Sequence, residues 1–348
     1  MRRWIVVRPP GLPVSFRLGA RVPAVLLALT LVTLAGMVLN VGYGEYPISP
    51  PDVVRTVLGI EAGDGNYGFI VNTLRLPRVL VAFAVGVALA VAGAILQGIT
   101  RNPLAAPEIV GVNAGAGLAA VTLIVALPAV SVAYLPFAAF GGALVVATLV
   151  YLISWKGGGA SPIRLILVGI GFAAMATALT TIMITFGEIY AVQQALVWLS
   201  GSVYARGWAE LFALLPWLAL FLPLAFAGAR QLNALNLGDD VARSLGGRVE
   251  LQRLSLIVVC VALAGAAVAT AGAIGFVGLM APHIARRLVG PSHEGLIPVA
   301  AMTGGMLVVL ADLVGRAAFS PIEIPCGLIT SAIGAPYFLY LLYRSRNL

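Results

Sequence analysis

Long runs of apolar residues follow one another along almost the whole chain, and only short polar connections separate them. A helix needs about 20 apolar residues to cross the hydrocarbon core of a bilayer, and the sequence divides into roughly ten such runs. Only 10% of the 348 residues are charged and 61% are hydrophobic, whereas a soluble domain is about one quarter charged. We therefore predict an all-α polytopic membrane protein with about ten transmembrane helices, in which residues 1–348 form a single membrane domain. The predicted spans are Val22–Val41, Val79–Thr100, Ile109–Ala129, Val132–Ser154, Leu165–Gly187, Leu211–Ala229, Leu254–Ile274, Gly275–Val289, Ile297–Val314 and Gly327–Tyr343.

The basic residues are distributed unevenly between the two sides that these spans define. If the N-terminus is cytoplasmic, 16 of the 21 Lys and Arg residues lie on the cytoplasmic side and 5 on the outer side. This excess is typical of the positive-inside rule, so both termini and the loop at residues 230–253 are predicted to be cytoplasmic. The inner set is Arg2, Arg3, Arg8, Arg17, Arg21, Arg101, Lys156, Arg164, Arg230, Arg243, Arg248, Arg253, Arg286, Arg287, Arg344 and Arg346. The outer set is Arg55, Arg75, Arg78, Arg206 and Arg316.

The segment Arg230–Arg253 is the longest polar stretch between two apolar blocks. Its run DDVARSLGG predicts a short helix, which Asp239 or Asp240 can cap at the start and Gly246 can end. On composition alone, this helix is either a solvated connector or a surface that binds another protein in the cytoplasm.

Several kinds of site are not supported by the sequence. No G-x-x-x-x-G-K-[ST] motif is present, so a nucleotide site of the P-loop type is excluded, and the glycines of Gly111–Gly117 are predicted to allow close helix packing. With only His283 and His293 available, a histidine metal site or a catalytic triad is not expected. Cys260 and Cys326 are predicted to be small buried residues. We therefore expect no enzyme activity, no metal and no cofactor.

The net charge of +8 is spread over span ends, which argues against nucleic-acid binding.

Four carboxylates, Glu108, Glu188, Asp312 and Glu323, fall near predicted span ends. Coupling to an ion gradient requires ionisable groups inside the membrane, and these are the only candidates. Their position at the ends favours interfacial caps and ion pairs. A gradient-driven secondary transporter therefore stays as the alternative from another functional class.

The outer arginines Arg75, Arg78 and Arg316 have two interpretations. They can reach the lipid headgroups or form a local ion pair, since Asp312 lies one helical turn from Arg316. They can also bind carboxylates of a partner protein at the outer face.

Many separate segments of the chain resemble the permease subunits of ABC importers for iron-siderophores, haem and vitamin B12, the FecCD/BtuC-type family. The resemblance extends in the family's order from the first span to the end of the chain. It is carried by TLRLPRVLVAFAVGVALAVAGAILQGITRNPLAAPEIVGVNAGAG, IRLILVGIGF, WLSGS, LNALNLGDDVARSLG, GAIGFVGLMAPHIARRLVGPSHE and GGMLVVLADLVGRAAFSPIEIPCGLITSAIGAPYFLYLL.

The resemblance implies a BtuC-like, ten-span subunit that works as a pair, with a second permease subunit that is the same chain or a homologue. It implies that Arg75, Arg78 and Arg316 contact an extracytoplasmic substrate-binding protein. It also implies that ABC ATPase subunits dock on the cytoplasmic loop, at Leu235, Leu237, Gly238, Asp239, Asp240, Ala242, Leu245 and Gly246.

The resemblance further implies that the fifth and tenth spans flank the transport pathway in the bacterial or archaeal plasma (inner) membrane, in contact with lipid. Ferric siderophores are the expected cargo, and vitamin B12 or haem stays open within the same class. ATP hydrolysis on a partner subunit would drive import. The expected lining residues are Thr177, Thr180, Thr181, Thr185, Gly334 and Pro336.

Overall fold

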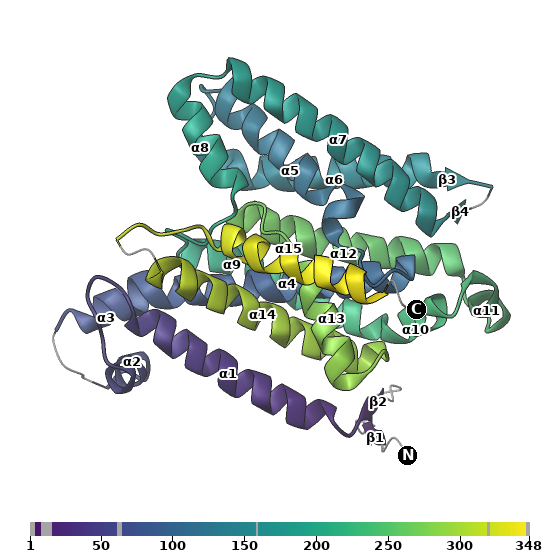
Figure 1. Cartoon of the computed structure of the whole chain (residues 1–348), viewed down its shortest axis with the longest axis horizontal. Coiled ribbons are helices and arrows are strands. Elements are labelled where there is room, and N and C mark those ends of the chain that lie inside the picture. Colours follow the sequence, from purple (N-terminus) through teal and green to yellow (C-terminus); the bar gives the residue numbers. More distant parts are fainter. Residues whose placement is uncertain (1–3, 8–15, 61–64, 158, 319–320, 346–348) are drawn as a thin grey trace.

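The computed structural model describes residues 4–7, 16–60, 65–157, 159–318 and 321–345, and these residues are mainly helical (Figure 1). In chain order the first elements are β1 (Trp4–Val7), β2 (Phe16–Gly19), α1 (Val22–Gly42), α2 (Pro50–Val57), α3 (Tyr67–Phe69), η1 (Ile70–Arg75), α4 (Leu76–Thr100), η2 (Pro107–Val110), α5 (Val112–Val121), η3 (Thr122–Ala126), η4 (Val132–Tyr134) and α6 (Leu135–Ser154). The remaining elements are β3 (Trp155–Lys156), β4 (Gly159–Ala160), α7 (Pro162–Phe186), α8 (Ile189–Leu199), α9 (Trp208–Ala227), α10 (Ala229–Asn236), α11 (Asp239–Ser244), α12 (Val249–Ala271), α13 (Val277–Val289), α14 (His293–Ala317) and α15 (Cys326–Ser345). Strands β1 and β2 pair antiparallel, as do β3 and β4.

Each of the ten predicted spans coincides with a helix, but two of these helices are short. Eight described helices are long and apolar enough to cross a membrane. The third span is helical only over Val112–Ala126, and α13, the eighth, has 13 residues. Both short helices follow a backbone turn with positive φ, 80° at Gly111 and 66° at Phe276. The chain therefore enters α5 through η2 and the turn at Gly111, and it enters α13 from the non-helical segment at residues 272–276.

The second span is longer than predicted. Continuous helical structure begins at Tyr67, whereas the predicted start was Val79. Arg75 and Arg78 were interpreted as residues at the end of a span. In the structure both side chains are buried and paired inside the protein, so the helix continues through them.

Helices α4, α12 and α14 form the centre of the molecule. Of the most apolar residues in the span that contains α4, 89% are buried inside the protein. The corresponding share is 17% in each of α1 and α7. The outer helices α1, α7, α9 and α15 keep large apolar side chains on their open faces. Such faces suit contact with lipid or with another membrane subunit.

Small residues allow the central helices to cross closely. A Cβ atom on Gly86 would collide with the Gly304 backbone, which joins α4 to α14. A Cβ atom on Gly93 would collide with the Gly278 carbonyl oxygen, which joins α4 to α13. Gly115 lies in the same way against Gly142 of α6, as expected for the glycines of Gly111–Gly117. Cys260 and Cys326 are free and buried, as predicted.

The helices run between two ends of the molecule (Figure 1). One end carries α2, α3 and α8 and is called the α2 end; the other carries α10, α11 and the β1–β2 hairpin and is called the α11 end. The predicted outer residues Arg75 and Arg316 contact the C-terminal part of α1 near α2. The predicted inner residues Arg101 and Arg253 contact α11. Arg2, Arg3, Arg8 and Arg346 lie outside the described residues.

Candidate functional site

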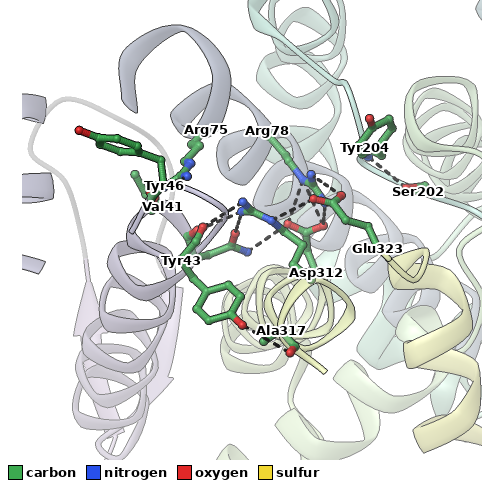
Figure 2. A network of polar contacts seen from close by, with 12 residues as sticks. Val41, Tyr43, Tyr46, Arg75, Arg78, Ser202, Tyr204, Asp312, Ala317 and Glu323 are labelled. Atoms are coloured by element: carbon green, nitrogen blue, oxygen red, sulfur yellow. Dashed lines mark hydrogen bonds and ion pairs between the residues drawn. The ribbon is translucent and has the colours of Figure 1, made fainter. Parts of the chain in front are cut away.

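At the α2 end, Arg75, Arg78 and Arg316 lie close together with two carboxylates, Asp312 and Glu323 (Figure 2). We call these five residues the arginine cluster. Each arginine is at most 9% exposed. The cluster is therefore largely buried, although sequence analysis placed its members separately at span ends.

Arg75 caps the C-terminal end of α1. Its Nη1 donates to the Val41 carbonyl oxygen at 2.8 Å, and its Nη2 donates to the Tyr46 carbonyl oxygen at 2.8 Å. The last carbonyl groups of a helix lack donors within the helix and carry partial negative charge. Arg75 thus keeps its positive charge, with main-chain oxygens as its partners, and has no carboxylate partner in the described part of the chain.

Arg78 forms the central ion pairs. Its Nη2 lies 2.7 Å from Oδ1 of Asp312, and its Nη1 lies 2.8 Å from Oε2 of Glu323. The ring of Tyr204, which is 63% exposed, lies 5.6 Å from the guanidinium carbon. Arg78 thus connects α4 with α14, with the segment before α15 and with the segment between α8 and α9 (Figure 2).

Arg316 joins α14 to the end of α1. Its Nη1 donates to Oδ1 of Asn40 at 2.8 Å, and its Nη2 donates to the Tyr43 carbonyl oxygen at 2.9 Å. Its Nε lies 3.4 Å from Oε1 of Glu323. Glu323 therefore bridges Arg78 and Arg316.

The structure brings the three predicted arginines together but assigns their partners differently from the sequence. Asp312 bonds Arg78 and not the neighbouring Arg316. Asn40 of α1 bonds both Arg316 and Asp312. Sequence analysis missed Asn40 and Tyr204, since nothing in their spacing connects them to α14. Asp312 and Glu323 are in ion pairs, as predicted for carboxylates near span ends.

At the α11 end, Asp239 fastens α11 to the body of the protein. Its Oδ2 lies 2.7 Å from Nη2 of Arg253, a side chain that is 1% exposed, and its Oδ1 lies 3.4 Å from Nη2 of Arg101. Arg253 also pairs with Glu250 at 2.8 Å. The first residue of α11 is thus tied to the beginning of α12 and to the end of α4.

The predicted cap of α11 was wrong at its start and correct at its end. No side chain caps the helix: its N-cap is Gly238, with φ of 116°, because Arg253 and Arg101 bind the Asp239 carboxylate and Asp240 pairs with Arg243. Gly246, with φ of 81°, follows the helix as expected. Its N–H donates to the Arg243 carbonyl and the Gly247 N–H to the Ala242 carbonyl, each at 2.9 Å. This pattern is the Schellman motif.

An apolar stripe runs along the open side of this segment. Leu237, Val241 and Leu245 are 67%, 42% and 69% exposed, and together they form this stripe. The spacing of four residues places Val241 and Leu245 on one face of α11, and Leu237 lies between α10 and the turn at Gly238. Leu235 and Ala242 point the other way and are buried. Sequence analysis missed Val241, although its spacing of four residues from Leu245 was visible.

Helix α10 is fastened separately to α14. Asn233 Oδ1 accepts the His293 main-chain N–H at 2.9 Å and lies 2.8 Å from Nδ1 of the same residue. Asn233 Nδ2 donates to Oε2 of Glu294 at 2.7 Å. These bonds give His293 a structural role, and the described residues contain no group of three His, Cys, Asp or Glu that could hold a metal ion.

Residues 31–344 match the model of the FecCD transport family. The chain belongs to this family.

Individual relatives of this FecCD chain match it over most of its length. It is 45% identical to YfhA of Bacillus subtilis, named as a siderophore transport system permease, over 93% of this chain and 95% of YfhA. It is 43% identical to the cobalamin import system permease BtuC of Halobacterium salinarum, over 78% of this chain and 73% of BtuC. A solved inward-facing structure of a transporter assigned to the metal-chelate ABC type superposes with a TM-score of 0.83 and 31% identity, covering 92% of this chain and 99% of that one. The predicted family and BtuC-like all-α fold are confirmed.

The FecCD chain places its predicted pathway residues on different sides of α7 and α15. Thr177, Thr181 and Thr185 lie on one open face of α7, whereas Thr180 is buried and donates to the Ala176 carbonyl oxygen at 2.8 Å. On α15, Pro336 is exposed and Gly334 is buried.

Gly334 packs against Phe276, the residue that precedes α13, and a Cβ atom there would collide with the Phe276 side chain. The Phe276 N–H donates to Oε1 of Glu108 at 3.3 Å. The beginning of α13 is thus held between Glu108 of η2 and α15 of the FecCD fold.

Proposed function

We propose that this chain is the transmembrane permease subunit of a binding-protein-dependent ABC importer. It carries a ferric siderophore inward, and ATP hydrolysis on a partner subunit drives it. The main support for this proposal is the match to the FecCD family across nearly the whole chain. In addition, a relative named for siderophore transport matches more of this chain than the cobalamin relative does. Vitamin B12 or haem is the alternative cargo.

The ATPase subunit docks on the apolar stripe of Leu237, Val241 and Leu245. Burial of three exposed apolar side chains favours a protein contact, at about 25 cal/mol for each Å² removed from water. The ion pairs of Asp239 with Arg253 and Arg101 then transmit the movement of α11 to α12 and α4. The fastening of α10 to α14 through Asn233 provides a second connection.

The substrate-binding protein docks at the α2 end, over the arginine cluster. The cluster contains three guanidinium groups and two carboxylates, which leaves one net positive charge. The exposed rings of Tyr43, Tyr46 and Tyr204 surround it, and tyrosine is common in protein interfaces. A carboxylate of the partner that pairs with these largely buried arginines must lose its water, and this cost offsets much of the attraction. The arginines therefore set orientation and encounter rate more than affinity.

Two permease subunits enclose the pathway between their α7 and α15 helices. The open faces of these helices carry apolar residues with the hydroxyl groups of Thr177, Thr181 and Thr185. Such a lining interacts weakly with cargo, which suits a carrier that receives it from a high-affinity binding protein. The assembly lies in the plasma (inner) membrane of a bacterium or archaeon with both chain termini in the cytoplasm, and this subunit hydrolyses no ATP.

Co-purification from native membranes tests this proposal. The tagged chain, extracted gently, is expected to bring an ABC ATPase subunit with it. Proteoliposomes containing the complex and the binding protein should then take up a radioactive ferric siderophore only with ATP inside. Uptake driven by a proton gradient in vesicles that lack the ATPase would instead favour the secondary transporter. Uptake of cobalamin in place of the siderophore would identify cobalamin as the cargo and would leave the assignment as an ABC importer unchanged.

A further inference from the structure

Glu323 connects the arginine cluster to the beginning of α15. Its two carboxylate oxygens lie 2.8 Å from Nη1 of Arg78 and 3.4 Å from Nε of Arg316. The next residue, Ile324, donates its N–H to the Gly315 carbonyl oxygen of α14 at 2.9 Å. Helix α15 begins at Cys326. The ion pairs of one carboxylate therefore help to fix the first turn of α15.

The two carboxylates of the cluster differ in how firmly they are held. The Asp312 side chain is 3% exposed, lies within α14 and also accepts a bond from Asn40 at 3.1 Å. The Glu323 side chain is 32% exposed, precedes α15, and forms ion pairs with Arg78 and Arg316. An anion that approaches from outside the protein would therefore compete with Glu323 and not with Asp312.

The charge of the cluster favours such a competitor. Arg75 has only carbonyl oxygens as partners in the described residues, and the cluster has three guanidinium groups for two carboxylates. If a carboxylate of a partner takes the place of Glu323 on Arg78 and Arg316, the number of ion pairs stays the same. The state with Glu323 bound and the state with the partner's carboxylate bound can therefore be close in free energy. Two nearly balanced packings of one segment are what a ligand-driven switch requires.

We infer that Glu323 occupies the position that a carboxylate of the binding protein takes on Arg78 and Arg316 when it docks. Docking then displaces Glu323 and releases the segment at residues 321–325 and the first turn of α15. Because α15 borders the proposed pathway, this exchange couples docking to opening of the pathway at the α2 end. The inference rests on the proposed docking of a binding protein at the arginine cluster.

The exchange can be followed in the complete complex, reconstituted in lipid nanodiscs with its ATPase subunits. Spin labels are placed on Ile322→Cys, which is 71% exposed beside Glu323, and on Leu34→Cys of α1, which is 52% exposed. The native Cys260 and Cys326 are buried and remain unlabelled. Adding the binding protein should shift or broaden the distance distribution between the labels. In E323Q, which keeps a hydrogen-bond acceptor but loses the charge, the altered distribution should appear without the binding protein.

Affinity provides a second readout. E323Q should bind the binding protein several-fold more tightly, because the internal competitor for Arg78 and Arg316 has lost its charge. Glu188→Gln, a change at an exposed carboxylate between α7 and α8, should alter neither affinity nor distances. Unchanged or weaker binding by E323Q, together with labels that do not respond to docking, would overturn the inference.

Arg78→Gln separates this inference from the proposed function. If R78Q binds the binding protein as tightly as the unmodified complex, docking at the cluster is itself wrong. If R78Q weakens binding and E323Q has no effect on affinity or distance, docking stands and the displacement of Glu323 is wrong. If E323Q does not assemble, the label distances of the unmodified complex with and without the binding protein decide the question.

Discussion

The Nη2 atom of Arg78 lies 2.7 Å from Oδ1 of Asp312, and both side chains are almost completely buried. Breaking a buried pair by removing one member costs about 3–5 kcal/mol, and the remaining ion pair of Arg78 with Glu323 puts the loss of Asp312 at the lower end of that range. Asp312→Asn should therefore lower the stability of the chain in detergent by about 3 kcal/mol, measured as a fall in its thermal unfolding temperature. Asp240→Asn breaks an exposed pair with Arg243 and should leave that temperature unchanged. A similar temperature for both variants would contradict the structural role of Asp312.

Gly93 fixes the distance between α4 and α13. A methyl group at this position would collide with the Gly278 carbonyl oxygen, and neither helix can give way easily in a packed interior. Gly93→Ala should therefore cost about 1–3 kcal/mol or prevent folding, seen as a loss of monodisperse protein after extraction. Gly171→Ala on α7 is the matched control, since nothing lies within 4 Å of its added methyl group. It should fold normally and gain slightly from a better helix former.

The eight long apolar helices and their order were predictable from sequence, because apolar runs of membrane length are sufficient to define them. The short eighth helix was predicted at nearly its observed length. The short third helix was not, since the turn at Gly111 depends on packing against Val146 of α6. The predicted start at Val79 failed for a related reason. Arginines next to an apolar run indicate its end only if they face water, and Arg75 and Arg78 find their partners inside the protein.

The candidate sites were predictable in position but not in detail. Sequence analysis located both the arginines and the α11 loop, because polar residues are rare in this chain. It assigned Asp239 to a helix cap, since nothing in the sequence shows that Arg253 and Arg101 reach that carboxylate. Asn40 and Tyr204 approach the arginines only through the tertiary fold.

The apolar stripe of α11 should control binding of the ATPase subunit. Replacing Leu237, Val241 and Leu245 together by Ser removes the exposed apolar surface, while the buried Leu235 and Ala242 still hold the segment in place. We expect the amount of ATPase subunit that co-purifies with the chain to fall at least tenfold, since a loss of about 1.4 kcal/mol corresponds to a factor of ten.

Leu251→Ser provides the control for the stripe. Leu251 is 58% exposed on α12, outside the stripe, and its replacement should leave the ATPase bound. Equal recovery of the ATPase with the triple variant and with Leu251→Ser would show that the subunit docks elsewhere.

The Asp239 carboxylate should be needed for coupling more than for docking. Asp239→Asn removes the charge that pairs with Arg253 and Arg101 but leaves the exposed stripe intact. The variant complex should still hydrolyse ATP, while the amount of cargo transported per ATP falls several-fold. Asp239→Glu, which keeps a carboxylate at the same position, should transport normally. Equal coupling in the two variants would rule out transmission through Asp239.

The open face of α7 should be accessible to water if it lines a pathway. Thr177, Thr181 and Thr185 share this face. Leu179 lies on the opposite side of the same helix, and its side chain is 42% exposed. In Thr181→Cys a charged, water-soluble maleimide should label the thiol, because a pathway admits water. Leu179→Cys should react only with a lipid-soluble maleimide. Thr180→Cys should resist both reagents, as should the native Cys260 and Cys326, because all three positions are buried. Labelling of Thr181→Cys by the lipid-soluble maleimide alone, at the same rate as Leu179→Cys, would place this face in lipid and remove the threonines from the pathway.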